Sequence, residues 1–191
     1  MVFTFLATDL SFTTFCDSDW VRDTYDRKFT AAYLIYMGPN AISWSPKKQP
    51  TVAKSSTEDE YRTITTTTEL LWLHELLKKL GPPITKAPQL FSDNIGATYL
   101  CVYPMFHTRM KHLVIDYHFV RDLVASKELQ VSHVTTSHQL ANLFIKPLSH
   151  SRHAFLLDKI GVRYPSSILR EHVDSLFIHQ KQSSVDHTHA S

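Results

Sequence analysis

The sequence is short of cysteine, of net charge and of long apolar runs, and each shortage excludes a class of protein. Its two cysteines, Cys16 and Cys101, cannot build a disulfide framework or a cysteine-based metal site, and they suit a reducing compartment. The formal net charge of +2 does not mark a nucleic-acid-binding chain, so any basic surface must be local. No run reaches the roughly 20 apolar residues of a membrane-spanning helix. We therefore expect no membrane partner and an intracellular chain, in the cytoplasm or the nucleus.

The sequence does contain the composition of an ordinary globular domain. Hydrophobic residues make up 43% and charged residues 20% of the 191 residues, which is enough to bury a core. We expect one domain over residues 11–148, with a short extension at 1–10 before it and a C-terminal helix at 149–164 after it. Residues 165–191 are polar and rich in serine and histidine, so we expect this tail to be disordered.

Five segments are predicted to form strands because they alternate in polarity or are apolar and bounded by turn residues. They cover residues 12–20, 29–37, 41–45, 89–94 and 128–135. The first three follow one another closely, with a Gly-Pro-Asn turn at 38–40, which predicts an antiparallel meander. We expect residues 47–54 to be a basic loop that contains Pro50.

Apolar residues at helical spacing predict helices over residues 57–80, 95–102, 107–126, 137–146 and 151–162. The run of Thr65 to Thr68 disfavours a helix, but we expect the flanking leucines to override it. Ser137 is the expected cap of the fourth helix, and Trp44 and Trp72 are expected in the core. A meander followed by alternating helices and strands predicts an α/β fold with a mixed sheet.

The stretch Ala-Lys-Ser-Ser-Thr-Glu-Asp-Glu-Tyr-Arg-Thr, residues 53–63, begins the first long helix. Glu58 and Asp59 suit the positive end of a helix dipole, and we expect them only to favour the helix start. Glu60 differs, because Ile64 shares its side of the helix. Its carboxylate should therefore lie at the edge of the buried face.

Two aspartates end strands that could be neighbours. Asp17 ends the first predicted strand and Asp93 ends the fourth; if these strands are parallel neighbours, both lie at the sheet end where α/β folds place their sites. A helix packed on the sheet could bring Glu60 to them. Three such carboxylates need a cation between them, and Mg²⁺, or Mn²⁺ as an alternative, accepts such oxygen ligands. Two ions about 4 Å apart would activate a water for phosphodiester hydrolysis.

Seven sequence blocks resemble, in order, the ribonuclease H domain that ends the polyprotein of copia-type LTR retrotransposons. They are FCDSDW, ISWSPKKQPTVAKSSTEDEYRT, LLWLHELLKKLG, FSDNIGA, FHTRMKHLVIDYHFVRD, VTTSHQLANLFIKPLS and RHAFLLDKIGV, within residues 10–163. The resemblance implies a ribonuclease H-like fold, a five-stranded mixed sheet with helices on both faces. It also implies Mg²⁺-dependent cleavage of the RNA strand of an RNA–DNA hybrid through four acids.

Three of those acids carry over to this chain and the fourth does not. The first three fall on Asp17, Glu60 and Asp93. Where the family has Ala-Asp followed by Thr-Lys-Pro-Leu, this chain has Asn142 after an alanine, and then Ile-Lys-Pro-Leu at 145–148. An amide offers an oxygen to a metal but no charge, so Asn142 is a degenerate fourth position that weakens the hold on a cation.

Candidate substrate contacts lie next to these acids. Ser55, Ser56 and Asn94 are at helix starts, where backbone N–H groups bind phosphates, and Lys54 adds a positive charge beside them. The competing interpretation of the basic residues is an ordinary solvated surface.

Two classes of function stay open. The first is a metal-dependent endoribonuclease acting on RNA–DNA hybrids, a Pol fragment whose partner is the reverse transcriptase domain of its parent polyprotein. The second is a catalytically silent ribonuclease H-like remnant that binds nucleic acid or protein. The sequence does not reveal the oligomeric state.

Overall fold

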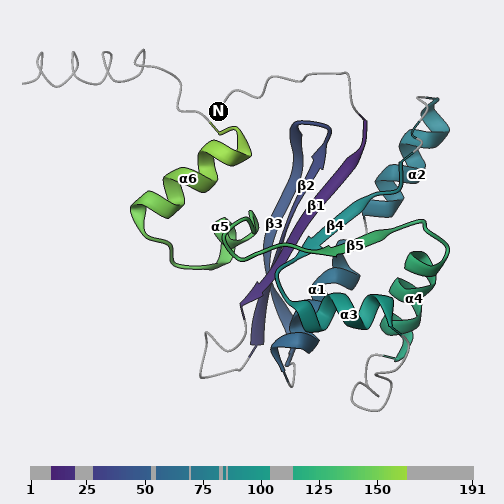
Figure 1. Cartoon of the computed structure of the whole chain (residues 1–191), viewed down its shortest axis with the longest axis horizontal. Helices are drawn as coiled ribbons and strands as arrows, with labels where there is room; N and C mark the ends of the chain where they lie inside the picture. Colours follow the sequence, from purple (N-terminus) through teal and green to yellow (C-terminus); the bar gives the residue numbers. More distant parts are fainter. Residues whose placement is uncertain are drawn as a thin grey trace, which may run out of the picture. The chain divides into compact units, whose positions relative to one another are not determined.

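Five strands form one mixed sheet in the order β3-β2-β1-β4-β5 in the computed structural model (Figure 1). The structure describes residues 10–19, 28–52, 55–68, 70–81, 84, 86–103 and 114–162. The strands are β1 Phe12–Asp19, β2 Lys28–Met37, β3 Asn40–Val52, β4 Gln89–Ser92 and β5 Gln130–His133. Contacts group Thr4–Gly161 into one unit, to which every site described below belongs.

The sheet combines a meander with two parallel additions. β1 pairs antiparallel with β2, and β2 pairs antiparallel with β3. β1 also pairs in parallel with β4, and β4 pairs in parallel with β5. The predicted five-stranded mixed sheet is therefore confirmed, with β1 and β4 as parallel neighbours.

Six helices accompany the sheet in the part of the chain that the structure describes. They are α1 Ser56–Thr67, α2 Leu70–Leu80, α3 Ile95–Val102, α4 Val114–Ala125, α5 Asn142–Ile145 and α6 His150–Ile160. Of the predicted helix over 107–126, residues 107–113 lie outside the described residues. Residues 1–9 of the predicted extension at 1–10, and all of the predicted tail at 165–191, do so as well. None of the described helices has the length and apolar character needed to cross a membrane.

Helices cover both faces of the sheet (Figure 1). On one face, α1, α3 and α4 share a core with β1, β4 and Leu129. That core consists of Cys16, Tyr61, Ile64, Leu90, Ala97, Leu100, Cys101, Val120 and Leu129. On the other face, α5 contributes Ile145, which packs with Ala141 against Ala32 of β2. Because neighbouring residues of a strand face opposite sides, β1 supplies Cys16 to the first core and Phe15 to the second.

The predicted single helix over 57–80 is wrong, because α1 ends at Thr67 and α2 begins at Leu70. Four successive threonine hydroxyls near this point donate to backbone oxygens within their own turn. The hydroxyls of Thr65, Thr66 and Thr67 each donate to the backbone oxygen of the residue four positions earlier. The hydroxyl of Thr68 donates to the backbone oxygen of Thr65. Such bonds compete with the helical pattern and disfavour its continuation, so the leucines of α2 pack as a separate helix.

The predicted loop over 47–54 is also wrong in part, because β3 continues to Val52. Pro46 lies opposite Ala32, and Val52 lies opposite Lys28. Among the described strands, β3 lies at the edge of the sheet and pairs only with β2. Proline is tolerated at an edge because one side of the strand donates no ladder bonds. Pro50 therefore does not end the strand.

The short helix after β5 differs from its prediction as well. α5 begins at Asn142, and Ala141 precedes it without a side-chain capping bond. Ser137 lies within a turn and is not its cap. The segment before the helix is held by Gln139, whose Oε1 accepts from the backbone N–H of Ala141 at 3.3 Å.

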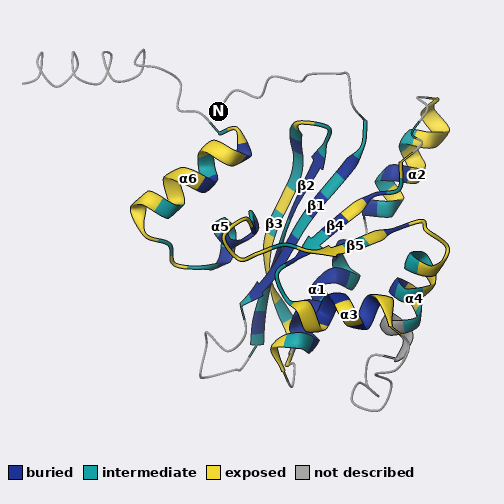
Figure 2. Cartoon of the chain, in the orientation of Figure 1, coloured by how far each residue is buried: buried dark blue, intermediate teal, exposed yellow. Residues whose placement is uncertain are grey.

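The two tryptophans expected in the core are exposed. Trp44 on the edge strand is 41% exposed, and Trp72 on α2 is 70% exposed. Figure 2 shows this contrast between buried central strands and an exposed outer side of α2. The periodicity around Trp72 was correct, but it is Leu70 that lies on the buried side of α2, at 1% exposure.

Candidate active site

The site begins where β1 and β4 stop pairing. Their last paired residues are Phe15 and Phe91, and Asp17 and Asp93 each follow two positions later. The two aspartates are therefore equivalent in register and emerge at the same end of parallel strands, where α/β sheets open. Asp17 is fully buried, and the side chain of Asp93 is 10% exposed.

Glu60 reaches both strand ends from α1. Its Oε1 accepts from the backbone N–H of Ser18 at 2.9 Å, and its Oε2 accepts from the hydroxyl of Ser92 at 3.2 Å. The Ser92 hydroxyl in turn accepts from the backbone N–H of Asn94 at 3.1 Å. Glu60 is 4% exposed, so this carboxylate is held at a fixed place between β1 and β4.

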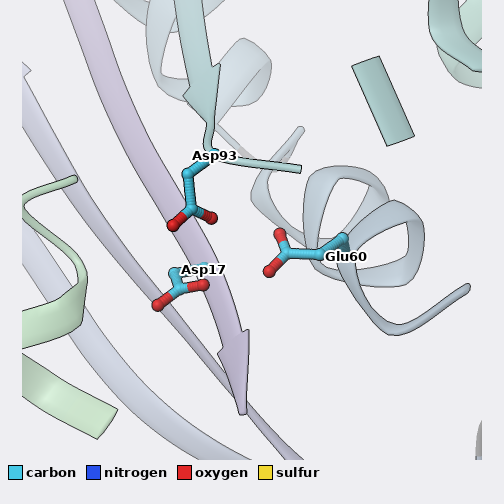
Figure 3. A group of neighbouring side chains, drawn as sticks. All are labelled: Asp17, Glu60 and Asp93. Carbon is cyan, nitrogen blue, oxygen red and sulfur yellow. The ribbon is translucent and has the colours of Figure 1, made fainter. Parts of the chain in front are cut away.

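The three carboxylates point toward one another (Figure 3). One ligand oxygen from each of Asp17, Glu60 and Asp93 lies within 4.8 Å of the others. The structure thus brings together the three acids that the sequence singled out. Their role as metal ligands stays a prediction.

Burial makes ionisation of this cluster costly. Burial raises the pKa of Asp17, and the charge of Asp93 adds to the rise, while Glu60 and Lys146 oppose it. Burial also raises the pKa of Glu60 well above its usual range, and the neighbouring charge of Asp17 adds to this. Because both groups lose water and face like charges, their surroundings disfavour the ionised form of each.

Lys146 adds a positive charge that the sequence interpretation missed. Its Nζ lies 2.8 Å from Oδ2 of Asp17 and 3.9 Å from Oδ2 of Asp93, and its side chain is 30% exposed. Burial alone would lower the pKa of Lys146, but the attraction of Asp17, Asp93 and Glu60 outweighs burial and raises it. Lys146 is therefore held as an ammonium beside the cluster.

Gln139 is a second residue that the sequence interpretation missed. Its fully buried side chain donates from Nε2 to the backbone oxygen of Cys16 at 2.8 Å and to that of Phe91 at 3.4 Å. Cys16 directly precedes Asp17, and Phe91 is two residues before Asp93. Gln139 therefore joins β1 to β4 at the point where their own pairing ends, and it sets the spacing of the two aspartates.

Asn142 takes the place of the missing fourth acid as the first residue of α5. It is 2% exposed, and its Nδ2 donates to the backbone oxygen of Thr136 at 3.2 Å. Its Oδ1 accepts no hydrogen bond from the described residues. One amide oxygen is thus buried without a donor, four residues before Lys146.

The predicted substrate contacts occupy two helix starts. Ser55 caps α1 by accepting from the backbone N–H of Glu58 at 3.2 Å, and Asn94 caps α3 by accepting from that of Ala97 at 3.0 Å. Ser56 is exposed in the first turn of α1. Lys54 lies outside the described residues.

The two helix starts lie against each other. A Cβ added to Gly96 of α3 would lie 3.1 Å from Oγ1 of Thr57 in α1. The positive ends of two helix dipoles therefore meet beside the carboxylates, where an anionic phosphate would be stabilised.

The neighbours of Glu60 do more than start a helix. Glu58 forms an ion pair of 2.9 Å with Arg62. Asp59 is fully buried, and neither of its carboxylate oxygens accepts a hydrogen bond from any described residue. Burial, together with the charge of Glu58, raises the pKa of Asp59 to about 7.

The cluster fits a hard divalent cation. It offers carboxylate oxygens from three elements within one small space, and Oδ1 of Asp17 is buried without a hydrogen-bond donor among the described residues. Hard cations such as Mg²⁺ prefer oxygen ligands of this type and complete their shell with water and substrate oxygens. Asp17, Glu60 and Asp93 are the residues that would hold the ion.

The sequence relatives of the chain are long polyproteins. It is 48% identical over 160 residues to the Retrovirus-related Pol polyprotein from transposon RE1 of Arabidopsis thaliana, covering 83% of this chain and 11% of the polyprotein. The polyprotein from transposon RE2 of the same plant is 48% identical over 154 residues, covering 80% and 11%. That from transposon TNT 1-94 of Nicotiana tabacum is 32% identical over 149 residues, covering 78% and 11%. The chain thus spans a small part of each relative, and no family model matches it.

Solved structures share the fold at low identity. The N-terminal RNase H domain of rv2228c from Mycobacterium tuberculosis has a TM-score of 0.50 and 10% identity, covering 78% of this chain and 98% of that chain. LC11-RNase H1, isolated from compost, also has a TM-score of 0.50 and 10% identity, covering 80% and 94%. Fold and sequence agree: the chain is homologous to a segment of copia-type retrotransposon Pol polyproteins and has a ribonuclease H-like fold.

Proposed function

We propose that the chain is a divalent-metal-dependent endoribonuclease that cleaves the RNA strand of RNA–DNA hybrids. The observation that carries this proposal is the meeting of Asp17, Glu60 and Asp93 within 4.8 Å at the open end of parallel strands. Such buried carboxylates are costly to ionise without a cation. Buried carboxylates of this kind are typical of functional sites, where a bound cation compensates their charge.

Asp17, Glu60 and Asp93 would hold the metal whose chemistry the hydrolysis needs. Bound Mg²⁺, or Mn²⁺ with similar oxygen preference, would lower the pKa of a water and stabilise the oxygen that leaves. The expectation from the sequence is two ions with substrate bound.

The residues of the chain supply position and charge. Glu60 is anchored through Ser18 and Ser92, so its carboxylate keeps its place when a cation binds. Gln139 links the two strands that carry the aspartates through its hydrogen bonds to both. A preorganised site of this kind loses little free energy to rearrangement during the reaction.

The two helix starts would bind the backbone of the hybrid. Backbone N–H groups near Ser56 and Asn94 offer donors to phosphate oxygens, and Ser55 and Lys54 lie next to them in the sequence. Recognition of the RNA strand would come from its 2′-hydroxyl groups, which DNA lacks.

A catalytically silent remnant is the second candidate. It is favoured by Asn142, which brings no charge to the fourth position, and by Lys146, which already compensates part of the negative charge. Such a module would keep the fold and bind nucleic acid or protein without cleaving it. In either case we propose that its partner is the reverse transcriptase domain of a parent polyprotein.

Cleavage of a labelled RNA–DNA hybrid by the purified chain tests the proposal. We expect cuts in the RNA strand that require Mg²⁺ and disappear in Asp93→Asn. Asp122→Asn is the matched control, because the side chain of Asp122 is 73% exposed on α4 and lies outside the carboxylate cluster; it should cleave like the wild type. A folded wild-type chain that cuts nothing at high Mg²⁺ would leave the silent remnant.

A further inference from the structure

The ammonium of Lys146 lies at the carboxylate cluster where a cation is needed. Its Nζ is 2.8 Å from Asp17 and 3.9 Å from Asp93, two of the three residues whose oxygens converge. A lysine at a surface salt bridge is usually solvated and adds little. This one instead contacts a fully buried carboxylate.

The backbone fixes where Lys146 lies. Its N–H donates to the backbone oxygen of Asn142 at 3.0 Å, which places it at the C-terminal end of α5. α5 is held on the sheet by Ile145, which packs with Ala141 on Ala32, and Ala32 is the cross-strand partner of Asp17. The ammonium therefore approaches Asp17 from the α5 face of the sheet, whereas Glu60 comes from α1 on the other face.

The charges at the site balance a single divalent cation. Three ionised carboxylates carry three negative charges, and Lys146 compensates one of them. The two negative charges that remain equal the charge of one divalent ion. A fourth carboxylate would add room for more positive charge, but this chain has the neutral Asn142 at that position.

We propose that Lys146 takes the place of one of two divalent cations, so that the free protein binds a single divalent ion at Asp17, Glu60 and Asp93. This inference rests on the proposed function, because it assumes that the cluster is a metal site. The expectation of two ions concerns the substrate-bound protein, whereas this inference concerns the free protein. The ammonium repels a second ion and keeps Asp17 and Asp93 close together before substrate arrives.

Titration of the full chain with Mn²⁺ alone, followed by calorimetry and by electron paramagnetic resonance of the unbound ion, tests this proposal. The wild type is expected to bind one ion. Lys146→Met removes the ammonium and should bind the first ion about tenfold to a hundredfold more tightly and admit a second. Lys146→Arg keeps the charge and should bind one ion like the wild type.

Lys78→Met is the matched control. Lys78 also forms an ion pair of 2.8 Å, with Glu75, but that pair is exposed on α2. Its loss should leave both the number of bound ions and their affinity unchanged. Circular dichroism and a thermal scan of each variant establish that it is folded.

The outcomes separate this inference from the nuclease proposal. The role of Lys146 would be overturned if the wild type bound two ions. It would also be overturned if Lys146→Met bound Mn²⁺ with the same number of ions and the same affinity as the wild type. A wild type that binds one ion, with tighter binding by Lys146→Met, supports it even if no hybrid is cut. That combination would contradict the nuclease and leave a metal-binding remnant.

Discussion

At the scale of single residues, Asp59 is a buried carboxyl group beside the proposed ligand Glu60. It is fully buried without a hydrogen-bond donor among the described residues, and its pKa is raised to about 7. A raised pKa of an acid means that the folded state binds the proton more tightly than the unfolded chain. The stability that this proton contributes is present below the ordinary aspartate pKa of about 4 and is lost as pH rises to about 7.

Asp59→Asn should therefore become more stable relative to the wild type as pH rises. We expect similar free energies of unfolding at pH 4, and an advantage for Asp59→Asn of about 1–3 kcal/mol at pH 8. Urea unfolding at both pH values measures this difference. Asp158→Asn, at an exposed position of α6, should show no such trend, and an advantage that is equal at both pH values would contradict the explanation.

Asn142 offers a second test at the same scale. Asn142→Asp adds a carboxylate four residues before Lys146 and loses the Nδ2 bond to Thr136, which costs about 1 kcal/mol of stability. Added negative charge strengthens the hold on a divalent ion, so we expect hybrid cleavage at low Mg²⁺ to rise about tenfold. The measurement is the cleavage rate against Mg²⁺ concentration.

The control for this substitution is Asn142→Leu, which removes the amide without adding charge. It should not raise cleavage at any Mg²⁺ concentration. If Asn142→Asp leaves a folded chain as inactive as Asn142→Leu, the missing fourth acid is not what limits activity.

At the scale of elements, the contact between the starts of α1 and α3 is tight. A Cβ on Gly96 would meet Oγ1 of Thr57 at 3.1 Å, Cγ2 of Thr57 at 3.2 Å and Oδ1 of Asn94 at 3.2 Å. An alanine is favoured over glycine in a helix by about 1 kcal/mol. Crowding against Thr57 opposes this gain, because two of its atoms would have to move.

Gly96→Ala should therefore lower the free energy of unfolding of the wild type by about 1 kcal/mol. In a Thr57→Ala background the same substitution should lower it less or raise it. A double-mutant cycle by urea unfolding measures this coupling. The same cycle with Thr65→Ala, which is on α1 but bonds within its own helix to Tyr61, should be additive. Gly96→Ala that stabilises the protein with Thr57 present would show that the contact is loose.

Local sequence patterns predicted most elements because their signals are local. The strands β1, β2, β4 and β5 and the helices α3 and α6 follow from alternation, helical spacing and turn residues. The division between α1 and α2 did not, because it depends on where the threonine hydroxyls donate. The length of β3 depends on its place at the sheet edge, which local patterns do not report.

The acids of the site were accessible to sequence reasoning because they stand at element ends. Lys146 and Gln139 were not, because their partners, Asp17 and Cys16, are more than a hundred residues away in the chain. One signal did exist, since Lys146 follows Asn142 by four residues, a spacing that puts both on one side of a helix. A buried glutamine carries no such pattern.

At the scale of the whole molecule, metal binding and folding should be linked through pH. Burial, with the charges of neighbouring acids, raises the pKa of Asp17 and Glu60. Their protons stabilise the metal-free fold at low pH, and that stability is lost as pH rises through the raised pKa values. A divalent ion needs the deprotonated carboxylates, so protons compete with it.

The rise in melting temperature caused by Mg²⁺ should therefore be larger at pH 8 than at pH 6. Mg²⁺ at a hundred times its dissociation constant adds about 2.7 kcal/mol, which corresponds to a shift of about 5–11 °C for a domain of this size. Differential scanning calorimetry with Mg²⁺, and with NaCl of equal ionic strength, measures the specific part. Asp93→Asn should show a smaller shift at pH 8, because one charged ligand is gone. A shift in the wild type that is equal at both pH values would mean that Mg²⁺ does not bind at this cluster.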